Sequence, residues 1–172
     1  MGKTLSAFDI GWPGAISRSV DDIVVSLKNA GTDPIPFGAP VFLTDDGEGV
    51  TAFVPNGSQT FSRFAGFAVR SADKTPDTYP AGQDMSTTAG SQAASWNPGE
   101  VVEVLVRGCI AVRTAPGFQP GGSVYLRKAD GVLVAAAGTE GTTLLLENVR
   151  IRRPQTGSGP CSEALVTSRN IQ

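Results

Sequence analysis

Short apolar runs separated by glycine and proline constrain the fold of this chain most. Within the runs, apolar and polar residues tend to alternate, which is typical of strands that bury one face. Turn signals such as Asn56-Gly57 and Asp130-Gly131 lie between runs. The runs are DIVVSLK (22–28), APVFL (39–43), FSRFAGFAVR (61–70), VVEVLVRGCIAVR (101–113), SVYLRK (123–128) and VLVAA (132–136). They predict an all-β fold, a compact β-barrel or sandwich of about eight to ten short strands.

The composition agrees with many short elements. The chain has 172 residues, of which 21 are glycine and 12 are proline, and only 17% are charged. Globular domains usually contain about 25% charged residues. No stretch has the sustained apolar spacing of a long amphipathic helix.

The N-terminal residues do not follow the strand pattern. Residues 1–20 have no sustained period, but Phe8, Ile10 and Trp12 alternate along the chain, so they would share one side of an extended segment. Pro13-Gly14 follows and would separate that segment from the rest. We expect an extended arm over residues 1–20, in contact with another protein subunit, and a single β-domain over residues 21–172. The alternative is that the arm is the first strand of the domain's own sheet.

A second segment, about residues 71–99, is a long loop dominated by small and polar residues. Loops of this length are uncommon in compact domains unless they have a function. Its tyrosine and tryptophan favour packing against some surface. The candidate contact residues of the arm and the loop are Phe8, Ile10, Trp12, Tyr79 and Trp96.

The expected core comes from the inward positions of the predicted strands, with the reservation that a shift of one residue exchanges the buried set for its neighbours. The predicted core residues are Val24, Val41, Phe67, Val69, Val104, Val106, Ile110, Val112, Val124, Leu126, Val149, Ile151 and Leu165.

The sequence offers few groups for catalysis. It contains no histidine, which excludes Ser-His and Cys-His nucleophiles and the commonest metal ligand. The two cysteines, Cys109 and Cys161, are expected to be small buried hydrophobes. Asp45-Asp46-Gly47-Glu48 is expected to be an acidic turn, because its spacing does not match a calcium loop. We expect no enzyme activity, no metal and no cofactor.

Charge is distributed unevenly along the chain. Residues 1–50 contain seven acidic residues and three basic ones, whereas residues 141–172 contain Arg150, Arg152, Arg153 and Arg169 with two glutamates. Two solvated faces explain this distribution, and a polar rim for subunit contacts explains it as well. A net charge of -2 gives no reason to expect direct nucleic-acid binding. Without a signal peptide or membrane span, synthesis in a cytoplasm is expected.

The order of several stretches resembles one known family. The stretches are GWPGAISRSVDDIVVSLKNAG, RFAGFAVRSADKTPDTYPAG, NPGEVVEVLVRGCIAVRTAPG and GGSVYLRKADGVLV, together with the final EALVTSRN. In this order they resemble the structural cement, or capsid decoration, proteins of tailed phages. The segment MSTTAGSQAASWNPG, in the long loop, is an extension relative to shorter relatives.

The resemblance implies a non-enzymatic virion protein on the outer surface of the capsid, made in the host cytoplasm. Its implied partner is the major capsid protein, whose neighbouring subunits it would bridge. The arm over residues 1–20 would contact this capsid protein or a neighbouring copy. We also expect contacts with other copies of the chain, in a trimer rather than a dimer, and no membrane contact. Two other classes stay open, a phage tail or baseplate structural protein and a carbohydrate-binding β-sandwich module.

Overall fold

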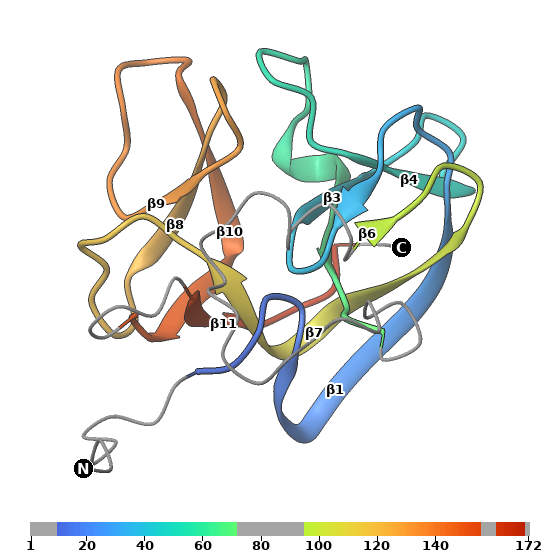
Figure 1. Ribbon diagram of the computed structural model, residues 1–172. Helices are drawn as coiled ribbons and strands as arrows, with labels where there is room; N and C mark the ends of the chain where they lie inside the picture. Colours follow the sequence, from blue (N-terminus) through green and yellow to red (C-terminus); the bar gives the residue numbers. More distant parts are fainter. Residues whose placement is uncertain (1–9, 72–94, 156–160, 171–172) are drawn as a thin grey trace, which may run out of the picture.

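The computed structural model describes residues 10–71, 95–155 and 161–170 (Figure 1). Strands dominate these residues, and the one helix among them is a 3-10 turn, η1, at Phe61–Arg63. The all-β prediction is confirmed. The strands are β1 (Ile16–Asn29), β2 (Ile35–Pro36), β3 (Pro40–Leu43), β4 (Gly49–Ala52), β5 (Phe64–Ala68), β6 (Ser95–Trp96), β7 (Val101–Arg113), β8 (Ser123–Arg127), β9 (Leu133–Val134), β10 (Thr143–Arg153) and β11 (Cys161–Val166).

Five strands form a closed ring, which we call the first ring. They pair in the order β1-β4-β3-β5-β7, and β1 closes the ring because it also pairs with β7. The β1–β7 pairing is antiparallel and extends to Lys28 opposite Val101. The β1–β4 pairing is parallel and joins only Lys28 and Asn29 to Gly49 and Val50.

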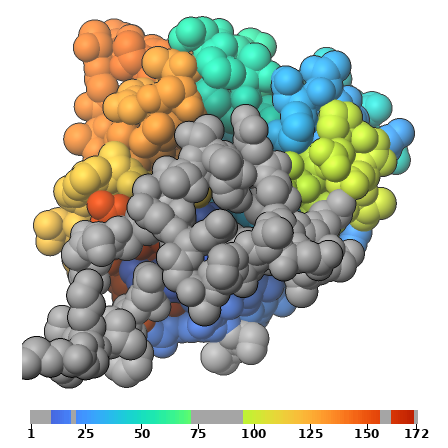
Figure 2. All heavy atoms as spheres, in the orientation of Figure 1, coloured from blue at the N-terminus to red at the C-terminus, as the bar shows by residue number. Residues whose placement is uncertain are grey.

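Strands β8 to β11 form a second ring that shares β7, while β2 and β6 pair as a separate two-stranded sheet. The sheet continues from β7 through β11, β10 and β8 to β9. It returns to β7 through a bridge between Thr114 and Leu133, beside which Ala115 N–H donates to the Leu133 carbonyl at 2.9 Å. The two rings are the right and left lobes of Figure 1. In the space-filling view, the orange residues of the second ring contact the teal residues that follow β4 (Figure 2).

Each ring has its own apolar core. All five strands of the first ring contribute to one cluster, which therefore fills that ring, and Ile35, Phe37 and Trp96 join it from β2, β6 and their flanks. The second cluster fills the second ring and continues onto Phe42, Phe64 and Phe67 of β3 and β5. Side chains of β7 enter both clusters, so this strand is buried on both faces over much of its length.

Most predicted core residues are buried, but two are not. Val24 is 38% exposed and Leu165 is half-buried, whereas Ala164 and Val166 are fully buried. In β1, Val25 packs against the core of the first ring instead. Both errors are shifts of one residue, which the alternating pattern permits.

The first strand begins within the expected arm. β1 starts at Ile16, which pairs with Ile110, so residues 16–20 belong to the sheet. The strand is interrupted between Arg18 and Ile23, where the pairing on β7 advances only from Cys109 to Arg107. This bulge breaks the apolar period, which explains why the sequence pattern does not reveal the start of the strand. Residues 1–9 lie outside the described part.

The loop predicted over residues 71–99 ends earlier in the structure than expected. Ser95 and Trp96 form β6, which pairs with Pro36 and Ile35 of β2. Residues 72–94, with Tyr79, lie outside the described part.

Candidate functional site

An aromatic cluster lies near the start of the described chain, and the guanidinium of one arginine contacts two of its rings. The guanidinium carbon of Arg70 is 5.5 Å from the ring centroid of Trp12 and 5.6 Å from that of Phe37. Phe37 and Trp96 meet edge to face, with centroids 5.9 Å apart. We call these four residues the Trp12 cluster. A cation over an aromatic ring contributes roughly 0.5–1 kcal/mol at a partly exposed site.

Gly14 attaches the first described residues to the domain. Its N–H donates to the Ala111 carbonyl, and its carbonyl accepts from Arg70 N–H, both at 2.8 Å. Its φ is +80°, and a Cβ at this position would lie 2.9 Å from the backbone nitrogens of Arg70 and Gly38. Only glycine satisfies both restrictions. The expected break at Pro13-Gly14 is therefore wrong, because both residues are buried within the domain.

Trp96 is a core residue. It is 6% exposed, and its indole N–H donates to the Val69 carbonyl at 3.0 Å. The ring is occupied by intramolecular contacts, so we do not retain Trp96 as a surface contact residue. Its role is to support Phe37 and, through Phe37, the Arg70 guanidinium.

The structure places Ile10 and Trp12 at the surface. Both side chains are half-buried, and Trp12 contacts Arg70. Arg70 immediately precedes Ser71, the last described residue before residues 72–94, and Trp96 follows Ser95, the first described residue after them. The described chain therefore starts, stops and resumes around one cluster. Phe8 and Tyr79 lie outside the described residues, so their predicted contacts remain predictions.

A charged group that the sequence analysis missed lies on the outer face of β11. Glu163 is 1% exposed, and its Oε1 accepts from Ser17 Oγ at 2.7 Å and from Arg18 Nε at 3.0 Å. Glu163 pairs with Ala111 on β7, while Ser17 and Arg18 belong to β1 on the other side of β7. This contact fastens the start of β1 to the second ring. Glutamate within the apolar run of β11 is the only sequence signal for it.

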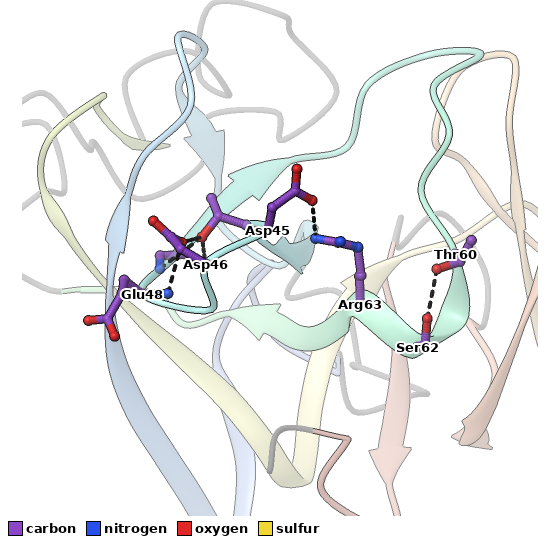
Figure 3. Close-up of polar contacts among 8 residues, drawn as sticks. Asp45, Asp46, Glu48, Thr60, Ser62 and Arg63 are labelled. Atoms are coloured by element: carbon purple, nitrogen blue, oxygen red, sulfur yellow. Dashed lines mark hydrogen bonds and ion pairs between the residues drawn. The ribbon is translucent and has the colours of Figure 1, made fainter.

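The acidic turn is present as predicted and joins β3 to β4 (Figure 3). The Thr44 hydroxyl donates to Asp46 Oδ1 at 2.5 Å, and Glu48 N–H donates to the same oxygen at 3.0 Å. These hydrogen bonds hold the pKa of Asp46 below its ordinary value, and the one from Thr44 contributes most. Asp45 pairs with Arg63 of η1 at 2.5 Å. Among the described residues, no group of three or more acidic or cysteine side chains could hold a metal ion.

Both cysteines are buried, as predicted. Cys109 lies on β7 and Cys161 on β11, on the outer face of the strands. The Arg152 guanidinium lies 3.9 Å from the Cys109 sulfur. No helix in the described ranges is long and apolar enough to span a bilayer.

A family model for the structural cement protein (E217 gp24/Pam3 gp6) matches residues 3–165 of the chain. The chain belongs to this phage structural cement protein family. The family predicted from the order of the sequence stretches is thereby confirmed, and the protein is a structural cement protein.

The fold of this cement protein also occurs in a solved phage particle. A chain from the capsid of Myoviridae phage XM1 superposes with a TM-score of 0.65 at 14% sequence identity. The match covers 96% of this chain and 95% of that chain. At this identity the comparison shows a common fold. No curated protein matches the sequence.

Proposed function

We propose that this cement protein binds the outside of a phage capsid shell and bridges neighbouring major capsid protein subunits. The observation that carries the proposal is the family match, which extends over residues 3–165. The fold shared with a chain of the phage XM1 capsid supports it, because that match covers nearly all of both chains. Bridging suits a small domain, because many modest contacts multiplied by symmetry stabilise an array.

The proposed contact with the shell is the surface around the Trp12 cluster. Ile10 and Trp12 are the described members of the predicted contact set that are open to solvent. Trp12 has one face against Arg70, so its position is fixed while part of the ring stays accessible. Fixed aromatic side chains make effective contact residues because little entropy is lost when they bind.

We propose that the protein is a structural component without enzyme activity. It is made in the host cytoplasm and resides on the outer surface of the virion. Its proposed partners are the major capsid protein and other copies of itself, with a trimer favoured over a dimer, and it requires no cofactor.

Decoration of capsids that lack the cement protein tests this function. Purified wild-type protein should saturate such shells and raise the temperature at which they release DNA. Trp12→Ala should weaken binding to the shells by roughly tenfold or more, in the range of a contact hot spot. Val101→Ala is the matched control, because Val101 is 57% exposed and lies outside the Trp12 cluster. Failure of the wild-type protein to bind, or binding at the tail alone, would contradict the proposal.

A further inference from the structure

Four arginines gather on the outer surface of β1 and β10. Arg150 and Arg152 point away from the core of the second ring, because Val149 and Ile151, which alternate with them along β10, are buried in it. Arg152 and Arg153 are exposed, and Arg152 reaches across β11 to Cys109, the β7 residue that pairs with Arg18. We call Arg18, Arg150, Arg152 and Arg153 the arginine face.

Most donors of the arginine face have no carboxylate partner within the described structure. Arg18 pairs with Glu163 through Nε, and its side chain is still 45% exposed. Arg150 donates from one terminal nitrogen to the carbonyls of Glu147 and Val149, which carry no net charge. Two carboxylates lie nearby at the bulge of β1, where Asp21 pairs with Arg107 and Asp22 lies beside Cys109 N–H. The face keeps a surplus of positive charge.

Glu163 lies beneath this face with one acceptor unused. Its Oε2 is buried and has no hydrogen-bond partner. The arginine face therefore combines unused guanidinium donors at its surface with an unsatisfied buried acceptor below. Such a surface is suited to a partner that brings carboxylates to the guanidinium groups.

The opposite charge lies at the acidic turn, between β3 and β4 of the first ring. Asp45, Asp46 and Glu48 face solvent there, with Arg63 as the nearby cation (Figure 3). The hydrogen bonds from Thr44 and from Glu48 N–H occupy Oδ1 of Asp46 and fix the shape of the turn. No hydrogen bond or ion pair joins the Glu48 carboxylate to another residue drawn in Figure 3. In Figure 1 the strands β3 and β4 belong to the right lobe, and β10 and β11 to the left.

We propose that the arginine face of one copy binds the acidic turn of a second copy, head to tail. The charge complementarity is contained in the chain itself. Three of the four arginines lie on β10 of the second ring, whereas the acidic turn joins β3 to β4 of the first ring, so one copy can use both surfaces at once. This contact deepens the proposed function, and rests on it, because a cement protein works as an array of copies. It assigns a role to the uneven charge that the sequence analysis left open between solvated faces and a subunit rim.

A contact between two different surfaces determines the kind of assembly. When each copy turns its arginine face and its acidic turn toward two different neighbours, the contact builds a ring if the rotation between copies closes and a row if it does not. Around a ring, each copy offers one acidic turn and receives another. A ring of three copies is the trimer that the proposed function favours.

Sedimentation of the purified protein at low ionic strength tests the contact. The wild-type protein should self-associate, and added salt should weaken association because the contacts are exposed and screened. Arg152→Glu combined with Arg153→Glu should weaken self-association by about tenfold or more, and so should Glu48→Lys. An equimolar mixture of the two variants should associate more strongly than either variant alone, because the intact face of one can meet the intact turn of the other.

Matched controls separate this contact from a general effect of charge. Glu140→Lys makes the same charge change as Glu48→Lys at an exposed position, and Lys28→Glu with Arg169→Glu matches the double arginine variant. Both controls should associate like the wild type. A wild-type protein that stays monomeric at millimolar concentration and low salt would overturn the proposal. Equal association of the variants and the wild type would also overturn it. The assay contains no capsid, so capsid binding could persist while this contact fails, and the reverse.

Discussion

At the scale of single residues, Glu163 shows the strongest conflict between burial and charge. A carboxylate that is 1% exposed is costly unless it is paired. Its partners come from β1, so the contact links a strand of the first ring to the second ring. The sequence pattern could not predict this pair, because Arg18 and Glu163 are separated by 145 residues.

Replacing the two members of this pair should have unequal effects. Arg18→Ala leaves a buried carboxylate with Ser17 as its only donor, so we expect a loss of about 1–2 kcal/mol in unfolding free energy. Glu163→Gln removes the charge and keeps an acceptor for Ser17, and the half-exposed Arg18 can turn to water. It should therefore cost less than Arg18→Ala. Urea denaturation measures both, and a larger loss for Glu163→Gln would contradict the interpretation.

Trp96 illustrates a different limit of sequence reasoning. Its neighbours Ala93, Ala94, Ser95, Asn97 and Pro98 give no alternating pattern, and this suggested a tryptophan on a loop. Two-residue pairing with β2 and the hydrogen bond to Val69 bring it into the core. Both contacts join residues that are distant in sequence, so local propensity cannot predict them.

At the scale of elements, the sequence predicted bends better than strand ends. A glycine within an apolar run predicts a bend or bulge, and one is present at Gly66, where the β3–β5 register shifts between Val41, opposite Gly66, and Phe42, opposite Phe64. Arg107-Gly108 predicts a corner in the same way, and Gly108 has a φ of +123° opposite the bulge of β1. Glycines at positive φ leave a local signal, whereas the start of β1 depends on its pairing with β7.

Gly66→Ala should be among the most damaging small substitutions in the chain. Gly66 has a φ of +156°, and a Cβ there would lie 2.1 Å from the carbonyl oxygen of Leu105 in β7. This oxygen belongs to the strand shared by both rings, so it cannot move cheaply. We expect a loss of more than about 3 kcal/mol in unfolding free energy, measured by urea denaturation.

The control for this substitution is Gly141→Ala. Gly141 also has a positive φ, +80°, but a Cβ there would meet nothing within 4 Å. Its loss should be about 1 kcal/mol, the backbone cost of a left-handed alanine without a clash. Equal losses at the two positions would show that the close approach to Leu105 has no energetic consequence.

At the scale of the whole molecule, the two rings depend on β7. Its residues Val102, Val104 and Val106 face the first core, while Leu105, Ile110 and Val112 face the second. Both faces of the strand are therefore buried, and the alternating pattern alone could not show that two cores exist. The closures, β1 on β7 and Thr114 on Leu133, join residues far apart in the chain. The sequence predicted a barrel or sandwich, and long-range pairing decides which strands close it.

The attachment of the first residues to this double ring yields the last prediction. Deletion of residues 2–9 removes none of the contacts that join the described residues, so the melting temperature should stay within about 3 °C of the full chain, equivalent to roughly 1 kcal/mol at this size. Deletion of residues 2–14 also removes Trp12 from Arg70 and the two Gly14 hydrogen bonds. It should lower the melting temperature by about 5 °C or more.

Capsid decoration by the same two deletions then separates stability from binding. If residues 2–9 with Phe8 contact the shell, the shorter deletion should bind capsids at least about tenfold more weakly while it melts like the full chain. Normal decoration by this variant would restrict the proposed contact to the Trp12 cluster. A large loss of stability on removal of residues 2–9 would contradict the expectation that the fold does not depend on those residues.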